Sequence, residues 1–165
     1  MSKHGLLLAT TLSLMGVSAA KAACPSVPTV SRYSFNAAGD EVTDSKTRLV
    51  WARCSLGQTW DGTTCTGTAS THSHEQAMGL AQAASGWRLP NVKELTSIAD
   101  KGCRSPAIDS KAFPNTPRAW YWSSSPYVGG AGNAWIVDFD DGSVNYGDRS
   151  YLGYPRPLRL VRVSQ

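Results

Sequence analysis

Two short stretches of the sequence carry side chains whose types and spacing could hold a metal ion. His72-Ser73-His74-Glu75 has the His-x-His spacing of a chelating pair. Asp138, Asp140 and Asp141 gather carboxylates that could bind Ca²⁺, although the extended acidic loop and distal Glu of an EF-hand are missing. We interpret the first stretch as a helix cap and the second as a hairpin turn, so we expect no metal site and keep Ca²⁺ as the alternative at 138–141.

Recognised catalytic motifs do not accompany these residues. The sequence has no Gly-x-Ser-x-Gly elbow, no His-Glu-x-x-His motif and no phosphate-binding loop. We therefore predict that the protein is not an enzyme and has no catalytic residues. Four late arginines could bind sulfate or carboxylate through bidentate contacts, or one or more could be buried as partners of Asp138 or Glu94. They are Arg149, Arg156, Arg159 and Arg162.

The first 22 residues predict export. A polar head containing Lys3 precedes an apolar run over residues 5–19, and Ala20-Lys21-Ala22 is typical of a signal-peptidase site. The run is shorter than the ~20 residues that span a bilayer. We expect a periplasmic or extracellular protein without membrane insertion, with lipidation of Cys24 as the alternative. Because the net charge of +4 includes Lys3 and Lys21, the mature chain is only weakly basic, which disfavours nucleic acid as a partner.

Four cysteines are typical of disulfide bonds in an exported domain. Their spacings of 30, 11 and 38 residues lack the close pairs of a zinc site, which is the alternative. The polar, Gly-containing segment between Cys54 and Cys65 closes most easily. We predict the bond Cys54–Cys65, and Cys24–Cys103 by elimination.

Two short helices are predicted after the cysteine loop. The first has a capping-box pattern at Ser73 and Gln76 and ends at Gly86, and the second has Asn91 and Glu94 in the same capping roles. Their predicted apolar faces are Ala77, Leu80, Ala81 and Ala84 in the first helix and Val92, Leu95, Ile98 and Ala99 in the second.

Alternation of apolar and polar residues predicts strands on both sides of these helices. Short strands are expected at 33–35, 41–43 and 47–51, and a later antiparallel sheet at 134–139, 143–146 and 158–162. Residues 146–157, rich in Tyr, Gly and Pro, predict a long irregular loop, a common place for a binding site. Helices early and strands late indicate an α+β fold rather than alternating α/β.

Several tryptophans are expected in the core, namely Trp51, Trp122 and Trp135. Trp87-Arg88-Leu89-Pro90 is interpreted as a structural device in which Trp87 and Leu89 are buried and Arg88 makes an internal ion pair.

Several motifs, in this order and spacing, resemble the Lcl C-terminal-domain-like family. The resemblance spans roughly residues 38–163 and includes the loop between Cys54 and Cys65. The motifs are Leu49-Val50-Trp51, Gly86-Trp87-Arg88-Leu89-Pro90-Asn91-Val92-Lys93-Glu94-Leu95, Phe113-Pro114-Asn115-Thr116, Tyr121-Trp122-Ser123-Ser124-Ser125-Pro126, Ala134-Trp135-Ile136-Val137-Asp138-Phe139 with Gly142, and Arg159-Leu160-Val161-Arg162.

This resemblance implies a C-type-lectin-like fold, related to formylglycine-generating-enzyme and sulfatase-modifying-factor domains and to the variable proteins of diversity-generating retroelements. It also implies ligand recognition, since the best-known member ends a collagen-like bacterial adhesin that recognises sulfated glycosaminoglycans. This chain lacks the adhesin's Gly-X-Y repeat and the calcium and sugar motif of vertebrate C-type lectins. No cysteine follows Cys103, so we expect no formylglycine-generating activity.

Between the motifs shared with the family lie polar and tyrosine positions suited to recognition. Tyr provides rigid contact area, and small polar groups provide hydrogen bonds. We predict that they form a ligand-binding surface, with a solvated loop as the alternative. The predicted site residues are Tyr127, Asn133, Asp140, Asp141, Asn145, Tyr146, Asp148, Arg149, Tyr151, Tyr154 and Arg156.

These observations predict a secreted, non-enzymatic, adhesin-like recognition domain that binds a glycan or a protein through its late loops and needs no cofactor. The alternative is a structural subunit of a periplasmic or surface assembly that binds a protein partner through the same loops. The expected organisation is a signal peptide at 1–22, an N-terminal extension at 23–37 and a C-type-lectin-like domain at 38–165.

Overall fold

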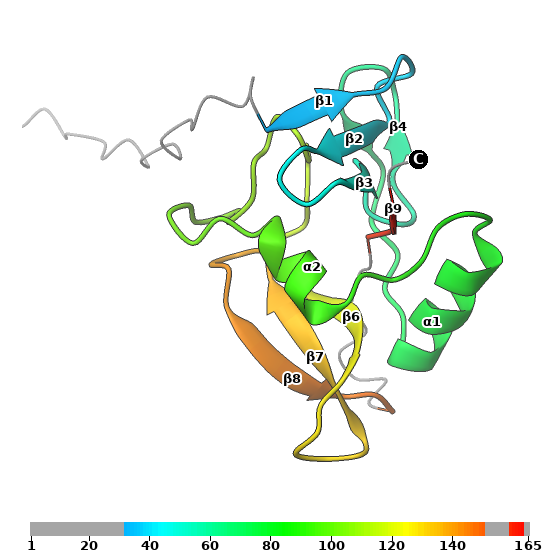
Figure 1. The fold of residues 1–165 in the computed structure, drawn as a ribbon, viewed down its shortest axis with the longest axis vertical. Coiled ribbons are helices and arrows are strands. Elements are labelled where there is room, and N and C mark those ends of the chain that lie inside the picture. The colour runs from blue at the N-terminus through cyan, green and yellow to red at the C-terminus, as the bar shows by residue number, and fades with distance from the viewer. Residues whose placement is uncertain (1–31, 151–158, 164–165) are drawn as a thin grey trace, which may run out of the picture.

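Two antiparallel sheets, a small hairpin and two helices make up the α+β fold in the part of the chain that the structure describes (Figure 1). The computed structural model describes residues 32–150 and 159–163. The first sheet contains β1 (Tyr33–Phe35), β2 (Glu41–Asp44), β3 (Leu49–Ala52) and β9 (Val161–Val163), in that spatial order. Because β9 pairs antiparallel with β3, the end of the described chain returns to the sheet in which it begins, at the edge opposite β1. The α+β prediction is confirmed.

The second sheet is a three-stranded antiparallel meander in the order β6-β7-β8. Its strands are β6 (Trp120–Pro126), β7 (Asn133–Asp138) and β8 (Val144–Asp148). The late antiparallel sheet is therefore confirmed for the strands predicted at 134–139 and 143–146, but β8 continues through Asp148, so the predicted loop at 146–157 begins as strand. The predicted strand at 158–162 is wrong in its start and in its sheet, because pairing begins at Val161 and is with β3 of the first sheet, while Arg159 turns into the interior.

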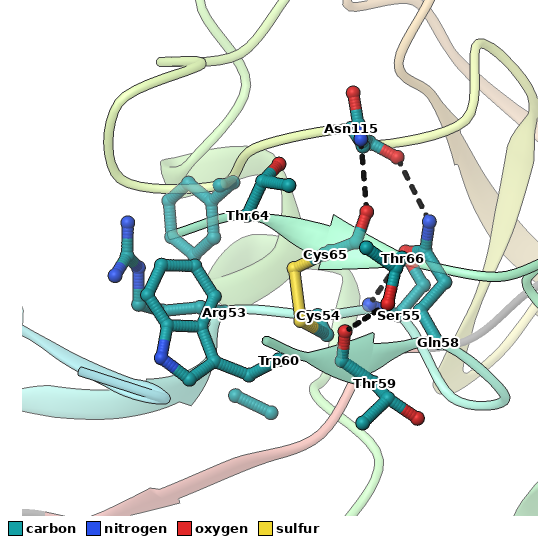
Figure 2. Close-up of a disulfide and its surroundings, with 12 residues drawn as sticks. Arg53, Cys54, Ser55, Gln58, Thr59, Trp60, Thr64, Cys65, Thr66 and Asn115 are labelled. Atoms are coloured by element: carbon teal, nitrogen blue, oxygen red, sulfur yellow. Dashed lines mark hydrogen bonds between the residues drawn. A yellow bond between two sulfur atoms is a disulfide. The ribbon is translucent and has the colours of Figure 1, made fainter. Parts of the chain in front are cut away.

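The loop between Cys54 and Cys65 is closed by the predicted disulfide and contains the hairpin of β4 (Thr59–Trp60) and β5 (Cys65–Thr66). Figure 2 shows Asn115 beside this hairpin. The Asn115 side-chain amide donates to the Cys65 carbonyl at 2.9 Å, and the Asn115 backbone carbonyl accepts from Gln58 Nε2 at 3.1 Å. Cys103 is also disulfide-bonded, and Cys24, its predicted partner, lies outside the described residues.

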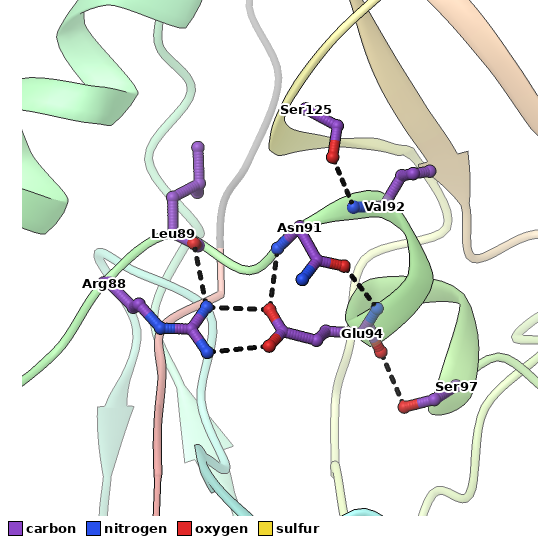
Figure 3. Close-up of polar contacts among 7 residues, drawn as sticks. All are labelled: Arg88, Leu89, Asn91, Val92, Glu94, Ser97 and Ser125. Atoms are coloured by element: carbon purple, nitrogen blue, oxygen red, sulfur yellow. Dashed lines mark hydrogen bonds and ion pairs between the residues drawn. The ribbon is translucent and has the colours of Figure 1, made fainter.

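Both predicted helices form, and both begin with the predicted capping box. In α1 (His74–Ala83) the box joins Ser73 and Gln76, and in α2 (Val92–Ser97) it joins Asn91 and Glu94 (Figure 3). Leu80 is exposed rather than on the buried face, because α1 contacts the core through His74, Ala77 and Ala81. None of the described helices is both long enough and apolar enough to cross a bilayer.

Arg88, ahead of α2, forms a bidentate ion pair with Glu94, with both N···O distances at 2.7 Å (Figure 3). The predicted internal ion pair is wrong in its placement, since the Arg88 side chain is 43% exposed. Leu89 is buried as predicted, whereas Trp87 is only half-buried beneath the guanidinium of Arg162, 5.2 Å from its ring centre. Arg162 pairs with Glu41 at 2.6 Å and so contacts neither predicted carboxylate partner.

In the second sheet, residues of β6 and β7 are buried on both faces, and a different helix packs on each face. Successive side chains of a strand point to opposite faces of the sheet. On one face Tyr121 and Val137 pack with Leu95 of α2, and on the other face Trp122 packs with Ala77 of α1. The core positions of Trp51 and Trp122 are confirmed, with both side chains fully buried. The meander therefore forms a rigid layer between α1 and α2.

Arg159 is fully buried and joins three segments that are distant in sequence. Its guanidinium donates to the carbonyls of Ala52 and Arg53 and to the hydroxyls of Ser55 and Thr116, the last at 2.7 Å. Burial lowers the pKa of this guanidinium. No carboxylate among the described residues pairs with it, so the predicted alternative of Asp138 or Glu94 as its partner is wrong.

Replacing Arg159 should destabilise the protein strongly. Arg159→Met keeps much of the apolar stem but leaves buried carbonyl and hydroxyl groups without their donor, which should cost roughly 3 kcal/mol of unfolding free energy. Urea denaturation followed by circular dichroism measures this loss. Arg104→Met, at an exposed position, is the control, and equal midpoints for the two variants would contradict the structural role.

His74 should make stability depend on pH. Its Nε2 lies 3.0 Å from the Ser123 carbonyl, and burial lowers its pKa below the ordinary 6.5. The fold therefore favours the neutral ring, so this stability is complete above pH 6.5 and is lost as pH falls through and below that value. Thermal melts at several pH values should show a flatter profile for His74→Gln than for wild type or His72→Gln; identical profiles would refute the assignment.

Candidate ligand-binding groove

Three aromatic side chains gather at the end of the second sheet where β6 turns into β7. Trp135 of β7 and Tyr146 of β8 are direct cross-strand partners, so their side chains lie on the same face. The ring of Tyr127 stacks on that of Tyr146 with centroids 4.1 Å apart and meets Trp135 edge to face at 5.0 Å. Tyr146 remains 47% exposed. We call Tyr127, Trp135 and Tyr146 the aromatic cluster.

A tight turn between β6 and β7 holds Tyr127 in this cluster. The backbone N–H of Tyr127 donates to the Asn133 carbonyl at 3.0 Å, and the N–H of Asn133 donates to Gly130 at 3.0 Å. A side chain at position 129 would place its Cβ 2.6 Å from the Tyr127 ring, so only glycine fits there. The turn sequence therefore allows the stacked position of Tyr127.

A groove of about 450 Å³ lies between α2 and the edge of the second sheet. Trp135 of the aromatic cluster forms part of its wall. The other lining residues are Val92, Lys93, Thr96, Ser97 and Val144. Its volume falls within the range of about 300–1,000 Å³ that is usual for ligand pockets. The groove and the aromatic cluster are continuous through Trp135 and together form the candidate site.

Hydrogen bonds to β6 position α2 along this groove. The backbone N–H of Val92 donates to the hydroxyl of Ser125 at 3.0 Å, which ties the first turn of α2 to the end of β6 (Figure 3). The Ser124 N–H donates to the Pro90 carbonyl at 2.8 Å. The buried residues Leu95 and Ile98 then pack in the cluster that contains Val137, while Trp135 on the same sheet face stays only partly buried.

Polar groups of the groove are mostly engaged within α2 itself. The Thr96 hydroxyl donates to the Val92 carbonyl at 2.6 Å, and the Ser97 hydroxyl donates to the Glu94 carbonyl at 2.6 Å. Lys93 is exposed and belongs to none of the ion pairs formed among the described residues. The site therefore offers apolar and aromatic walls with one cationic group.

Most of the predicted site residues that the structure describes lie at the end of the sheet that carries the aromatic cluster. Asn133 and Asp148 are cross-strand partners there, and the Arg149 N–H donates to the Gly132 carbonyl at 2.9 Å. Asn145 lies in β8, where its side-chain oxygen accepts from the Tyr146 N–H at 2.8 Å. Three further predicted residues, Tyr151, Tyr154 and Arg156, lie outside the described residues.

Asp140 and Asp141 lie apart from the others, in the turn at the opposite end of β7 and β8. The Asp140 carboxylate accepts from the Ser105 hydroxyl at 2.8 Å, and the Asp141 carboxylate accepts from the Ser143 N–H at 2.9 Å. Asp138 accepts from the Asp140 N–H at 2.8 Å, and burial raises its pKa. These carboxylates form the predicted hairpin turn and do not belong to the groove.

Histidines and carboxylates do not assemble into a metal centre within the described chain. No group of three or more His, Cys, Asp or Glu side chains that could hold an ion occurs in residues 32–150 and 159–163. His72 contacts the Ser70 hydroxyl at 2.9 Å, while His74 points to Ser123. The described residues therefore contain no set of side chains to which a metal could be assigned.

Sequence reasoning missed the groove residues for two reasons. Alternation with small or polar neighbours predicts that Trp135 is a core residue, yet it is only partly buried. The helix residues Val92, Lys93, Thr96 and Ser97 were assigned to a capped helix, but nothing in their spacing shows which sheet face the helix leaves open. Val144, the exposed cross-strand partner of Val137, indicates that this sheet face is partly open, but the pairing is known only once the strand register is known.

The comparisons with known proteins agree with the fold. A family model for the Lcl C-terminal domain matches residues 40–162, and no curated protein gives a significant match. The match begins just before β2 and ends within β9, so it leaves out β1 but includes the second sheet, both helices and the groove. The chain therefore belongs to the Lcl C-terminal domain family.

Proposed function

We propose that this protein is an exported, non-enzymatic recognition domain that binds a glycan or a protein through the groove and the aromatic cluster. One observation carries the proposal: Trp135 and Tyr146 are held side by side at the surface on a sheet that both helices support. A large aromatic surface that stays open to solvent in an otherwise well-packed domain is a feature of interaction sites.

The rigidity of the platform supports recognition as its role. Tyr127 is positioned by the tight turn, and Trp135 and Tyr146 by strand register, so little conformational entropy is lost when a ligand binds them. The adhesin-like character and the export of the chain rest on the family resemblance and on residues 1–22, respectively.

A structural role in a periplasmic or surface assembly is the second candidate. Val128, at the tip of the turn between β6 and β7, is 97% exposed and lies next to Tyr127. An apolar side chain projecting from a loop tip beside an aromatic cluster suits a protein interface. In this case the same end of the sheet would contact a fixed protein partner.

Removing the exposed ring should reduce ligand binding without unfolding the protein. Tyr146→Ala deletes the ring stacked on Tyr127, so binding to a glycan array, or to envelope proteins captured from native extracts, should fall about tenfold or more. The melting temperature should change by only a few degrees, because Tyr146 is exposed.

Met78→Ala is the matched control, since Met78 is exposed to a similar degree on α1. Both variants are purified as oxidised protein after export and compared with wild type on the same arrays and extracts. Binding that is unchanged in Tyr146→Ala, or equally reduced in the two variants, would refute the assignment of the site.

A further inference from the structure

The walls of the groove favour an apolar anchor over a sugar ring. Val92, Val144 and Trp135 supply its apolar surface, and the hydroxyl protons of Thr96 and Ser97 are already donated within α2. A sugar would bring many hydroxyl groups into a site with few free donors, which leaves polar groups unpaired and costs affinity. An aliphatic or aromatic side chain meets no such cost.

The charge at the groove favours an acidic partner. Lys93 is the only ionisable side chain among the lining residues, and it makes no ion pair within the described chain. The nearby Glu94 is neutralised by Arg88, with both N···O distances at 2.7 Å. A carboxylate placed beside an apolar anchor would therefore find an unopposed ammonium group at the rim.

The strand beside the groove can accept an extended segment. In the described chain β8 is the outer strand of the order β6-β7-β8. The Asp138 N–H donates to the Ser143 carbonyl and the Arg149 N–H donates to the Gly132 carbonyl, so these two cross-strand pairs are hydrogen-bonded. Hydrogen-bonded and non-hydrogen-bonded pairs alternate along an antiparallel ladder, so the backbone N–H and C=O groups of Val144 and Tyr146 point away from β7. The Tyr146 N–H is already bonded to Asn145, but the outward N–H and carbonyl of Val144 have no partner in the described chain.

We propose that the groove binds an extended acidic peptide segment, with an apolar side chain inserted against Trp135 and Val144 and a neighbouring carboxylate paired with Lys93. Hydrogen bonds between the backbone of the segment and the outer edge of β8 fix the direction of the segment, and the groove determines which side chains it must contain. This inference rests on the proposed recognition function and names the ligand class of the same site.

Selection from a displayed random peptide library tests the proposal directly. Peptides of about 12 residues are long enough to run along β8, and they are selected on the oxidised wild-type protein. Enriched sequences are expected to contain an aliphatic or aromatic residue flanked by Asp or Glu. A library that yields no binder, or binders without acidic residues, overturns the proposal.

The affinity of the best selected peptide is then measured by biolayer interferometry against three variants. Lys93→Glu reverses the charge at the rim and Val144→Asp places a charge in the apolar wall, so each should weaken binding about tenfold or more. Lys46→Glu makes the same charge change in the turn between β2 and β3, and should change affinity less than about twofold. Equal binding to wild type and Lys93→Glu overturns the proposal.

Two further measurements keep the test decisive. Raising salt from about 0.1 M to about 1 M shortens the screening length from about 10 Å to about 3 Å, so wild-type affinity should fall while that of Lys93→Met changes little. If Lys93→Glu lowers the melting temperature, Lys93→Met replaces it as the variant that removes the charge at the groove. Salt dependence that is identical in wild type and Lys93→Met overturns the Lys93 contact.

A glycan array separates failure of this inference from failure of the proposed function. Glycan binding that needs Tyr146 but is indifferent to Lys93→Glu and Val144→Asp, with no peptide selected, overturns the peptide proposal and leaves the recognition function in place. Blank results from the array, the peptide library and the envelope extract together overturn both.

Discussion

The buried guanidinium of Arg159 is the interaction on which the rest of the structure depends. It binds the chain just after β3, through the carbonyls of Ala52 and Arg53 and the hydroxyl of Ser55, and it binds Thr116 just before β6. A buried charge is costly unless its donors are hydrogen-bonded, and both terminal nitrogens of Arg159 depend on these acceptors, so the acceptors must converge for the fold to form. The network extends to the second sheet, because the Ser55 hydroxyl lies 2.6 Å from that of Tyr121 in β6. Arg159 thereby joins the two sheets and the cysteine loop.

The candidate site follows from how the second sheet is covered. Each face of the meander packs against one helix, but α2 is short and its hydrogen bonds to β6 lie at its first turn. The covered part of the face contains Val137, and the uncovered part contains Trp135 and Tyr146. Incomplete coverage of an otherwise buried sheet leaves apolar area exposed, which is unfavourable unless a ligand covers it. The groove is therefore a property of helix length and position as much as of its side chains.

Charge placement suits recognition of a ligand better than a general electrostatic role. Most of the cations that stabilise the fold are engaged: Arg32 pairs with Asp44, Arg88 with Glu94 and Arg162 with Glu41, while Arg159 is buried. Lys93, at the groove, makes no ion pair within the described chain, so its ammonium group can pair with a ligand. The carboxylates of the turn between β7 and β8 bond to nearby N–H and hydroxyl groups, which explains why an acidic cluster visible in the sequence contributes to a turn and not to the binding surface.

Local patterns in the sequence determined both capping boxes, the Cys54–Cys65 bond, the antiparallel late sheet and the membership of the family, because each depends on neighbouring residues or on a contiguous order of motifs. Tyr127 and Tyr146 were also predicted, as tyrosines between structural motifs. Only the tertiary structure decided that Trp135 is only partly buried, that Arg159 donates to carbonyls and hydroxyls and not to a carboxylate, and that Asp140 and Asp141 lie away from the groove. The physical reason is that exposure and pairing depend on which segments pack across a strand or helix, and side-chain periodicity gives the face of a residue without giving what covers it.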